Sequence, residues 1–223
     1  SFAYFCYDNL NRIKFPSTGV KGRIDFNWKD ARLSSKEFEN LQYGTVYMGL
    51  QGYIPVYKDN VVLIPHLYGS VLFGKGAING STEGWNSVFK GPVPMYASMN
   101  NMVGGTEMGR YIDQQLPFIG LNKTSLAFNN LAILRADIRV RLFKNHYLTA
   151  MVNYGRSSID FKNFFKESDN LMWSELYGYN ASNWWGAGLR YSIDTKIGPI
   201  SLDVSSSNIS RTVNIYFNLG YFF

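Results

Sequence analysis

The chain is nearly free of cysteine and histidine, and this scarcity excludes several kinds of site. Cys6 is the only cysteine among 223 residues, and the only histidines are His66 and His146. A single cysteine rules out an intrachain disulfide and a metal site built from several cysteines. We therefore expect no metal, no cofactor and a structural rather than reactive role for Cys6.

Long apolar runs are also missing. The longest apolar stretch, residues 61–67, is interrupted by Pro65 and His66, whereas a transmembrane helix needs about 20 mostly apolar residues. Charged residues make up 17% of the chain and aromatic residues another 17%; the charged share is below the roughly 25% of soluble domains. Because only helices and closed barrels satisfy every backbone polar group in lipid, any membrane-spanning form of this chain must be a β-barrel.

Sequence motifs of catalysis and nucleotide binding are absent. There is no Gly-x-Gly-x-x-Gly fingerprint, no phosphate-binding loop and no His-Glu-x-x-His pair. Neither His66 nor His146 has a well-placed serine for hydrolysis, so we expect no catalytic residues and no enzyme. The formal charge of +6 is compatible with nucleic acid, anionic lipid or an acidic partner, but we expect these cations to line a wet interior and expect no nucleic-acid binding.

The dominant pattern is an alternation with period two, which is typical of β-strands. It is clearest at 134–142, where Leu134, Ile138 and Leu142 share one face and Arg135 and Asp137 share the other. Similar segments predict nine strands in total, at 2–7, 20–29, 46–54, 61–73, 134–142, 148–154, 185–193, 200–205 and 212–223. The segment 61–73 is apolar on both faces and says least about its surroundings.

The connections between these segments differ in length. Short turns are expected at 11–19, 57–60, 143–146 and 195–199, and long polar links at 31–43, 75–125 and 161–182, with a brief one near 206–211. Short turns at one end and long loops at the other are typical of outer-membrane barrels. A link of about fifty residues would count against a compact soluble domain. We therefore predict an all-β, antiparallel transmembrane β-barrel over 1–223 rather than a soluble sandwich.

The number of strands raises a separate question. Bacterial single-chain barrels have an even number of strands, whereas nine are predicted. Either 2–7 is not a full strand, or further strands precede Ser1, or two copies close one larger barrel as a homodimer. The start at Ser1 rather than Met favours further strands upstream.

Several segments together resemble the barrels of the BamA superfamily of surface antigens. They are Tyr7-Asp8-Asn9-Leu10 with Phe15-Pro16-Ser17-Thr18-Gly19, Gly188-Leu189-Arg190-Tyr191 with 197–203, and the closing segment 214–223. The resemblance covers essentially the whole chain. It implies a bacterial outer-membrane location and the last eight or nine strands of a barrel that this family builds from sixteen.

The link 75–125 lies where that family carries a loop inside the barrel, marked by Val/Ile-Arg-Gly-Phe/Tyr. The matching residues are Gly109, Arg110 and Tyr111, with Gly and Arg in transposed order, followed by Gln115-Leu116-Pro117-Phe118. In the family the loop arginine meets an acidic residue of the inner wall, and Asp137 is the expected partner of Arg110. The other wall residues expected in the lumen are Lys21, Arg23, Arg135, Arg139, Arg141, Arg190 and Asp203.

The resemblance also suggests partners. Tyr221 and the terminal Phe223 match the signal by which the barrel assembly machinery recognises such proteins. The Gly-Arg-Tyr and Gln-x-Pro-Phe forms are similar to barrels fused behind a patatin-like phospholipase domain, so we expect upstream periplasmic or patatin-like domains. Outer-membrane lipid and lipopolysaccharide are the expected surroundings.

Together these features predict a barrel that inserts, secretes or anchors a polypeptide at the outer membrane. One alternative is a passive pore or adhesin-like small barrel, which predicts conductance or ligand binding that survives Arg110→Ala. A second alternative is an integral lipid hydrolase, which predicts lipase activity that is lost on mutation of His66.

Overall fold

A computed structural model of the chain describes residues 1–30, 42–75, 102–106, 115–121, 126–127, 130–158, 183–210 and 212–220. Over these ranges the secondary structure is strand and turn. No helix in this part of the chain is long and apolar enough to cross a membrane.

Nine antiparallel strands form one sheet, in which every strand pairs with the next in the order β1-β2-β3-β4-β7-β8-β9-β10-β11. Their bounds are β1 Phe2–Asp8, β2 Gly19–Asp30, β3 Gln42–Tyr57, β4 Val61–Lys75, β7 Asn130–Phe143, β8 His146–Ser158, β9 Asn183–Thr195, β10 Gly198–Ser207 and β11 Asn214–Leu219. Two short strands, β5 Met102–Val103 and β6 Leu126–Ala127, pair separately. The nine predicted strands are confirmed, although β3, β7 and β8 are longer at both ends than predicted and β11 begins at Asn214 rather than at 212.

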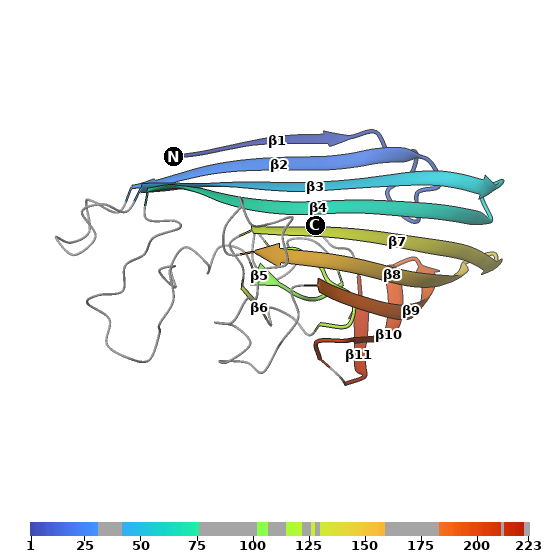
Figure 1. Cartoon of the computed structure of the whole chain (residues 1–223). Helices are drawn as coiled ribbons and strands as arrows, with labels where there is room; N and C mark the ends of the chain where they lie inside the picture. The colour runs from blue at the N-terminus through green and yellow to red at the C-terminus, as the bar shows by residue number, and fades with distance from the viewer. Residues whose placement is uncertain are drawn as a thin grey trace.

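The sheet is curved rather than flat. In Figure 1, β1 to β4 lie side by side in nearly the same direction, β9 slopes gently below β8, and β10 and β11 descend steeply beneath them. The tight turns after β3, β7 and β9 lie at one end of the strands, and the ranges 31–41, 76–101 and 159–182 connect strands at the other. This is the asymmetry of connections that the sequence predicted. The curvature of the sheet gives every strand one convex and one concave face.

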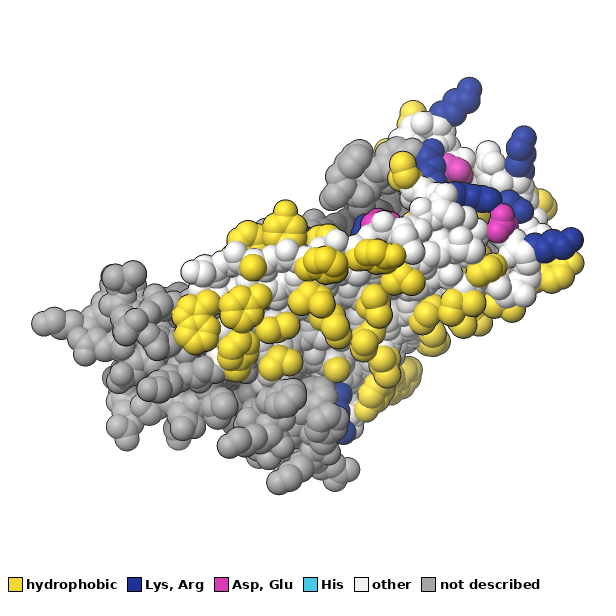
Figure 2. Space-filling model, turned by 90° about the horizontal axis from the view of Figure 1, so that it is seen from above, with side chains coloured by type: hydrophobic (Ala, Val, Ile, Leu, Met, Phe, Trp, Pro, Cys, Tyr) yellow, Lys and Arg dark blue, Asp and Glu magenta, His cyan; other side chains and the backbone are white. Residues whose placement is uncertain are grey.

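The convex face is apolar and exposed. On β7 and β8, Leu134, Ile138 and Val152 are between 50% and 57% exposed, while Arg135, Asp137 and Arg139, which alternate with the exposed residues of β7, are buried. Figure 2 shows the hydrophobic side chains spread along the visible flank of the sheet, with Lys and Arg gathered mostly at the end of the tight turns. An exposed apolar surface of this extent is a contact surface for lipid rather than water.

Aromatic side chains mark the two borders of this surface. Towards the tight turns the exposed aromatics are Tyr7, Tyr57, Phe143 and Tyr191, and towards the other end they are Phe26, Phe73, Tyr154 and Trp185. Outer-membrane barrels carry such aromatic girdles at both membrane interfaces. The exposed aromatic side chains near both ends of the strands fit two such girdles.

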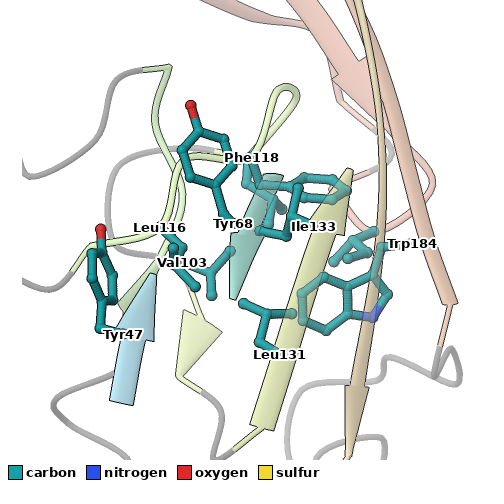
Figure 3. Packing of buried hydrophobic residues seen from close by; sticks show 10 residues of the cluster. Tyr47, Tyr68, Val103, Leu116, Phe118, Leu131, Ile133 and Trp184 are labelled. Carbon is teal, nitrogen blue, oxygen red and sulfur yellow. The ribbon is translucent and has the colours of Figure 1, made fainter. Parts of the chain in front are cut away.

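The concave face carries the polar side chains and the buried core. A cluster of ten buried residues joins this face to the segments around β5: Tyr47, Tyr68, Val103, Leu116, Phe118, Leu121, Leu131, Ile133, Trp184 and Ile209. In Figure 3, Val103, Leu116 and Phe118 lie between Tyr47 on one side and Ile133 and Trp184 on the other. On β4 the inner residues include His66, Tyr68 and Ser70, so this strand has a mixed inner face rather than two apolar ones.

Candidate functional site

The candidate site is the concave face of the sheet together with the segment 115–121 that packs on it. Glycines make the close approach possible. A Cβ at Gly155 would lie 2.9 Å from the Phe118 ring, and a Cβ at Gly186 would collide with the carbonyl oxygen of Ile119. Gly120 itself has a φ of 89° and its Cα faces the backbone of Ser206. The wall is therefore shaped for this segment, because ordinary side chains at these positions would displace it.

Polar side chains of the last strands bind the same segment through its backbone. Ser207 Oγ and Asn214 Nδ2 both donate to the carbonyl oxygen of Gly120, at 3.0 and 2.8 Å. The Tyr216 hydroxyl donates to the carbonyl of Leu121 at 2.6 Å. In the orientation that satisfies both ends of its amide, Asn153 donates to Gly186 O at 2.9 Å and accepts from the Ile119 N–H at 3.0 Å. The segment is thus held by β8, β10 and β11 together.

A second piece of the same link, 102–106, packs beside the first. The N–H of Gly104 donates to Leu116 O at 3.0 Å, and the N–H of Phe118 donates to Gly105 O at 3.1 Å. The side chain of Gln115 donates to the Gly104 carbonyl, and the Tyr47 hydroxyl donates to the Gln115 carbonyl at 2.7 Å. These bonds satisfy backbone groups that the closed packing removes from water. The two pieces form one unit, which we call the lumen segment (102–106 and 115–121).

A buried charge cluster lies next to the lumen segment. Arg135 donates to Asp137 through Nε to Oδ1 at 2.8 Å and through Nη2 to Oδ2 at 2.6 Å. His66 Nε2 lies 3.2 Å from Asp137 Oδ2, and His66 Nδ1 lies 2.8 Å from the Tyr68 hydroxyl. The side chains of Arg135 and Asp137 are only 3% and 5% exposed. Arg135 also donates to the carbonyl oxygen of Thr106 at 2.9 Å, so the wall charge binds the lumen segment directly.

This cluster bears on the predicted pairing of Arg110 with Asp137. Gly109, Arg110 and Tyr111 lie outside the described residues, as do Tyr221 and Phe223, and the roles expected of them stay predictions. Asp137 does face the concave side, and among the described residues Arg135, from two residues earlier in β7, forms an ion pair with its carboxylate. A buried carboxylate that accepts two hydrogen bonds from one arginine already gains much of the energy needed to offset its desolvation.

The other expected wall residues share the concave face. Arg190 binds Asp203 across β9 and β10 at 2.7 and 2.8 Å, and Arg23 binds Asp25 within β2 at 2.9 Å. Asp203 and Asp25 are at most 1% exposed, so these pairs are more buried than solvated lumen charges would be. Lys21 is exposed near Asp8 at 4.0 Å. Arg141 donates to Asn60 Oδ1 at 3.0 Å from Nε.

Arg139 has a different environment, in which aromatic rings surround the cation. Its guanidinium carbon lies 5.6 Å from the ring centre of Phe15 and 5.8 Å from those of Tyr53 and Tyr147. The guanidinium also donates to the carbonyl of Pro16. Phe15 stacks on Tyr147 with centroids 4.0 Å apart. Cation–π contacts of this kind are strongest where the groups are removed from water, and Arg139 is 7% exposed.

Phe15 and Pro16 belong to the connection between β1 and β2, which folds inward rather than projecting from the strand ends. We call residues 9–18 the inner turn. Lys14, on the same connection, donates to the carbonyl of Thr195 at 3.0 Å and pairs with Asp194 at 3.1 Å. Arg12 pairs with Asp59 of the next turn at 2.8 Å. The inner turn thus reaches from β2 to the end of β9 on the concave side.

Sequence reasoning expected 11–19 to be an ordinary short turn and missed this role. Two signals were available, namely its greater length than the other tight turns and the aromatic-proline pair in a polar connection. Neither says what the pair packs against, because its partners come from strands up to 181 positions away. Within the described residues, no group of three His, Cys, Asp or Glu side chains could hold a metal ion.

Comparisons with known proteins identify the family of the chain and structures of similar fold. Residues 75–223 match the family profile described as the OMP85 superfamily. Among solved structures, the chain is similar to "the crystal structure of BamA from Haemophilus ducreyi lacking POTRA domains 1-3", with a TM-score of 0.58 and 17% sequence identity. That match covers 96% of this chain and 40% of the BamA chain. A comparison with curated protein sequences gives no significant match.

Proposed function

Because the chain belongs to the OMP85 superfamily, we propose that it forms the barrel by which a larger protein inserts, secretes or anchors a polypeptide at the bacterial outer membrane. The observation that carries this proposal is the lumen segment held against β8, β10 and β11 inside an apolar-faced sheet.

Since the chain spans about 40% of the length of the BamA chain that it matches, the remaining parts of the proposal concern the whole protein. An upstream patatin-like domain would supply any enzymatic activity, with this barrel as its anchor or exporter. Strands from an upstream segment or from a second copy would extend the sheet beyond β1. The assembly machinery would insert the barrel among lipid and lipopolysaccharide. The intact mass of the native protein tests the upstream domain directly.

The test of the function uses the full-length protein in its own cells. Deletion of the gene is expected to remove at least one polypeptide from the outer membrane or cell surface, as measured by protease shaving and mass spectrometry. Complementation with Gly186→Ala, which displaces Ile119, should restore that polypeptide poorly. Tyr216→Phe, which removes only the hydroxyl bonded to Leu121, should have a smaller effect in the same direction.

Gly69→Ala is the matched control, because a Cβ there has its nearest contact at an ordinary 3.7 Å. Heat-modifiability on gels checks that every variant is folded in the membrane. An unchanged surface proteome in the deletion strain would contradict the proposal. Conductance in planar bilayers that Gly186→Ala does not alter would then favour the passive pore.

A further inference from the structure

Three tight hairpin turns repeat one pair of residue types. Tyr57 precedes Lys58 between β3 and β4, Phe143 precedes Lys144 between β7 and β8, and Ile197 follows Lys196 between β9 and β10. The apolar members are exposed by 60%, 69% and 73%, and the three lysines are exposed as well. We call these six residues the turn rim.

The positive charge of the three lysines is not offset by the acidic residues nearby. The aspartates at this end of the strands are already engaged: Asp59 with Arg12 at 2.8 Å, Asp194 with Lys14 at 3.1 Å, and Asp8 with Lys21 at 4.0 Å. Hydrogen bonding from the Ser17 side chain, and then the charge of Arg12, keep the pKa of Asp59 below its usual range. No ion pair joins a turn-rim lysine to a carboxylate of the described residues, so the rim has a net positive charge.

The backbone conformation of Lys58 indicates that a lysine occupies this turn for more than solubility. Lys58 has a φ of 45°, a left-handed conformation that glycine, asparagine and aspartate adopt more easily than lysine. Asp59 and Asn60, which suit such a position better, are the next two residues. The Lys58 ammonium also lies 5.9 Å from the centre of the Tyr57 ring, which keeps the cation beside its apolar neighbour.

The turn rim lies at the end of the strands where the apolar convex surface ends, and its Tyr57 and Phe143 also belong to the aromatic border described above. At this depth an apolar side chain reaches the acyl chains, while the adjacent ammonium group reaches the phosphate level. Because the sheet is curved and the three turns join successive hairpins, the three pairs would contact neighbouring lipids around the barrel.

We propose that the turn rim binds the headgroups of anionic phospholipids in the membrane leaflet that the tight turns face. Each lysine contributes one electrostatic contact, and each neighbouring apolar residue fixes its depth. This binding site shares no residue with the lumen segment, so the test of lipid binding is independent of the test of the proposed function.

The experiment measures lipid preference on the full-length protein by native mass spectrometry, with phosphatidylglycerol and phosphatidylcholine of matched chains as probes. Wild type is expected to retain phosphatidylglycerol in preference. Lys58→Gln, Lys144→Gln and Lys196→Gln should each lower that preference by about fivefold at low salt, and the triple variant should lower it most. Removal of three exposed lysines leaves the strands intact, and the single variants serve if the triple variant folds poorly.

The matched control removes the same number of positive charges from the long connections, by Lys36→Gln, Lys162→Gln and Lys166→Gln. This control is expected to keep the wild-type preference. Equal loss in the control and the rim variants would show a general charge effect and overturn the site. A wild-type protein with no preference for phosphatidylglycerol, or a triple variant that keeps it, would also overturn the proposal.

Discussion

At the scale of single residues, the charged pairs follow from strand geometry. Side chains two positions apart in a strand point to the same face, so Arg135 can fold back on Asp137 and Arg23 on Asp25. Arg190 and Asp203 are direct cross-strand partners in the register of β9 and β10. The pairs therefore need no contribution from the loops, although Arg135 also donates from Nη1 to the carbonyl of Thr106.

The Asp137 carboxylate is expected to be the most costly charge to remove. Asp137→Asn leaves the buried guanidinium of Arg135 with weaker compensation, and we expect a loss on the order of 3 kcal/mol in the free energy of unfolding. Urea unfolding of the folded protein in lipid vesicles measures this. Asp8→Asn is the control, because its pair with Lys21 is 4.0 Å apart and half exposed, and it should cost less than about 1 kcal/mol. Equal costs would show that burial does not decide the strength of these pairs.

At the scale of elements, the inner turn connects parts of the sheet that are far apart in strand order. It joins β2 to β7 through Arg139, to β8 through Tyr147 and to β9 through Asp194. Strands in a sheet bind only their neighbours, so this connection limits how far the curved sheet can open at the tight-turn end. The inner turn is therefore expected to behave as a part of the folded core and not as a mobile loop.

Phe15→Ala tests that expectation. Loss of the ring removes both the stacking on Tyr147 and one face of the Arg139 site. We expect trypsin to cut after Arg12 or Lys14 about tenfold faster, which corresponds to roughly 1.4 kcal/mol of lost attachment. Ile13→Ala serves as the control, because Ile13 is 94% exposed. Rapid cleavage of the wild type at these sites would contradict a fixed inner turn.

At the scale of the whole molecule, the sheet separates an apolar outer surface from a polar inner one. Along β7 the exposed side chains from Leu134 to Leu142 cover eight residue steps, or about 27 Å of strand. At a tilt of about 40° this is near the height of the apolar band of an outer-membrane barrel. The aromatic residues at both ends mark the same borders independently.

This arrangement predicts that the cost of a charge on the outer face depends on depth. Val152, in the middle of β8, and Val56, next to the turn after β3, are 57% and 64% exposed. Val152→Arg is expected to cost about 2–4 kcal/mol of folding free energy in lipid, and Val56→Arg about 0–1 kcal/mol. Folding yields into vesicles at graded urea concentrations measure both. Similar costs at the two sites would contradict the placement of the membrane.

The sequence alone was sufficient for the nine strands, for the two faces of most of them and for the asymmetry of the turns, but it missed the mixed inner face of β4. These depend on local alternation and on turn residues, which are readable from neighbours in the chain. Parity likewise puts Arg135, Asp137, Arg139 and Arg190 opposite the apolar face, and the first three are buried. A strand of period two leaves only two choices for each side chain.

Only the tertiary structure decided which partners these residues have. The cation on Asp137, the aromatic surroundings of Arg139 and the seating of Ile119 against Gly186 all join residues whose separation in sequence carries no signal. Curvature brings the concave faces of distant strands towards one another, and that curvature is a property of the whole sheet. The sequence thus determined which side each residue faces, and the packing of the folded chain determined what it meets there.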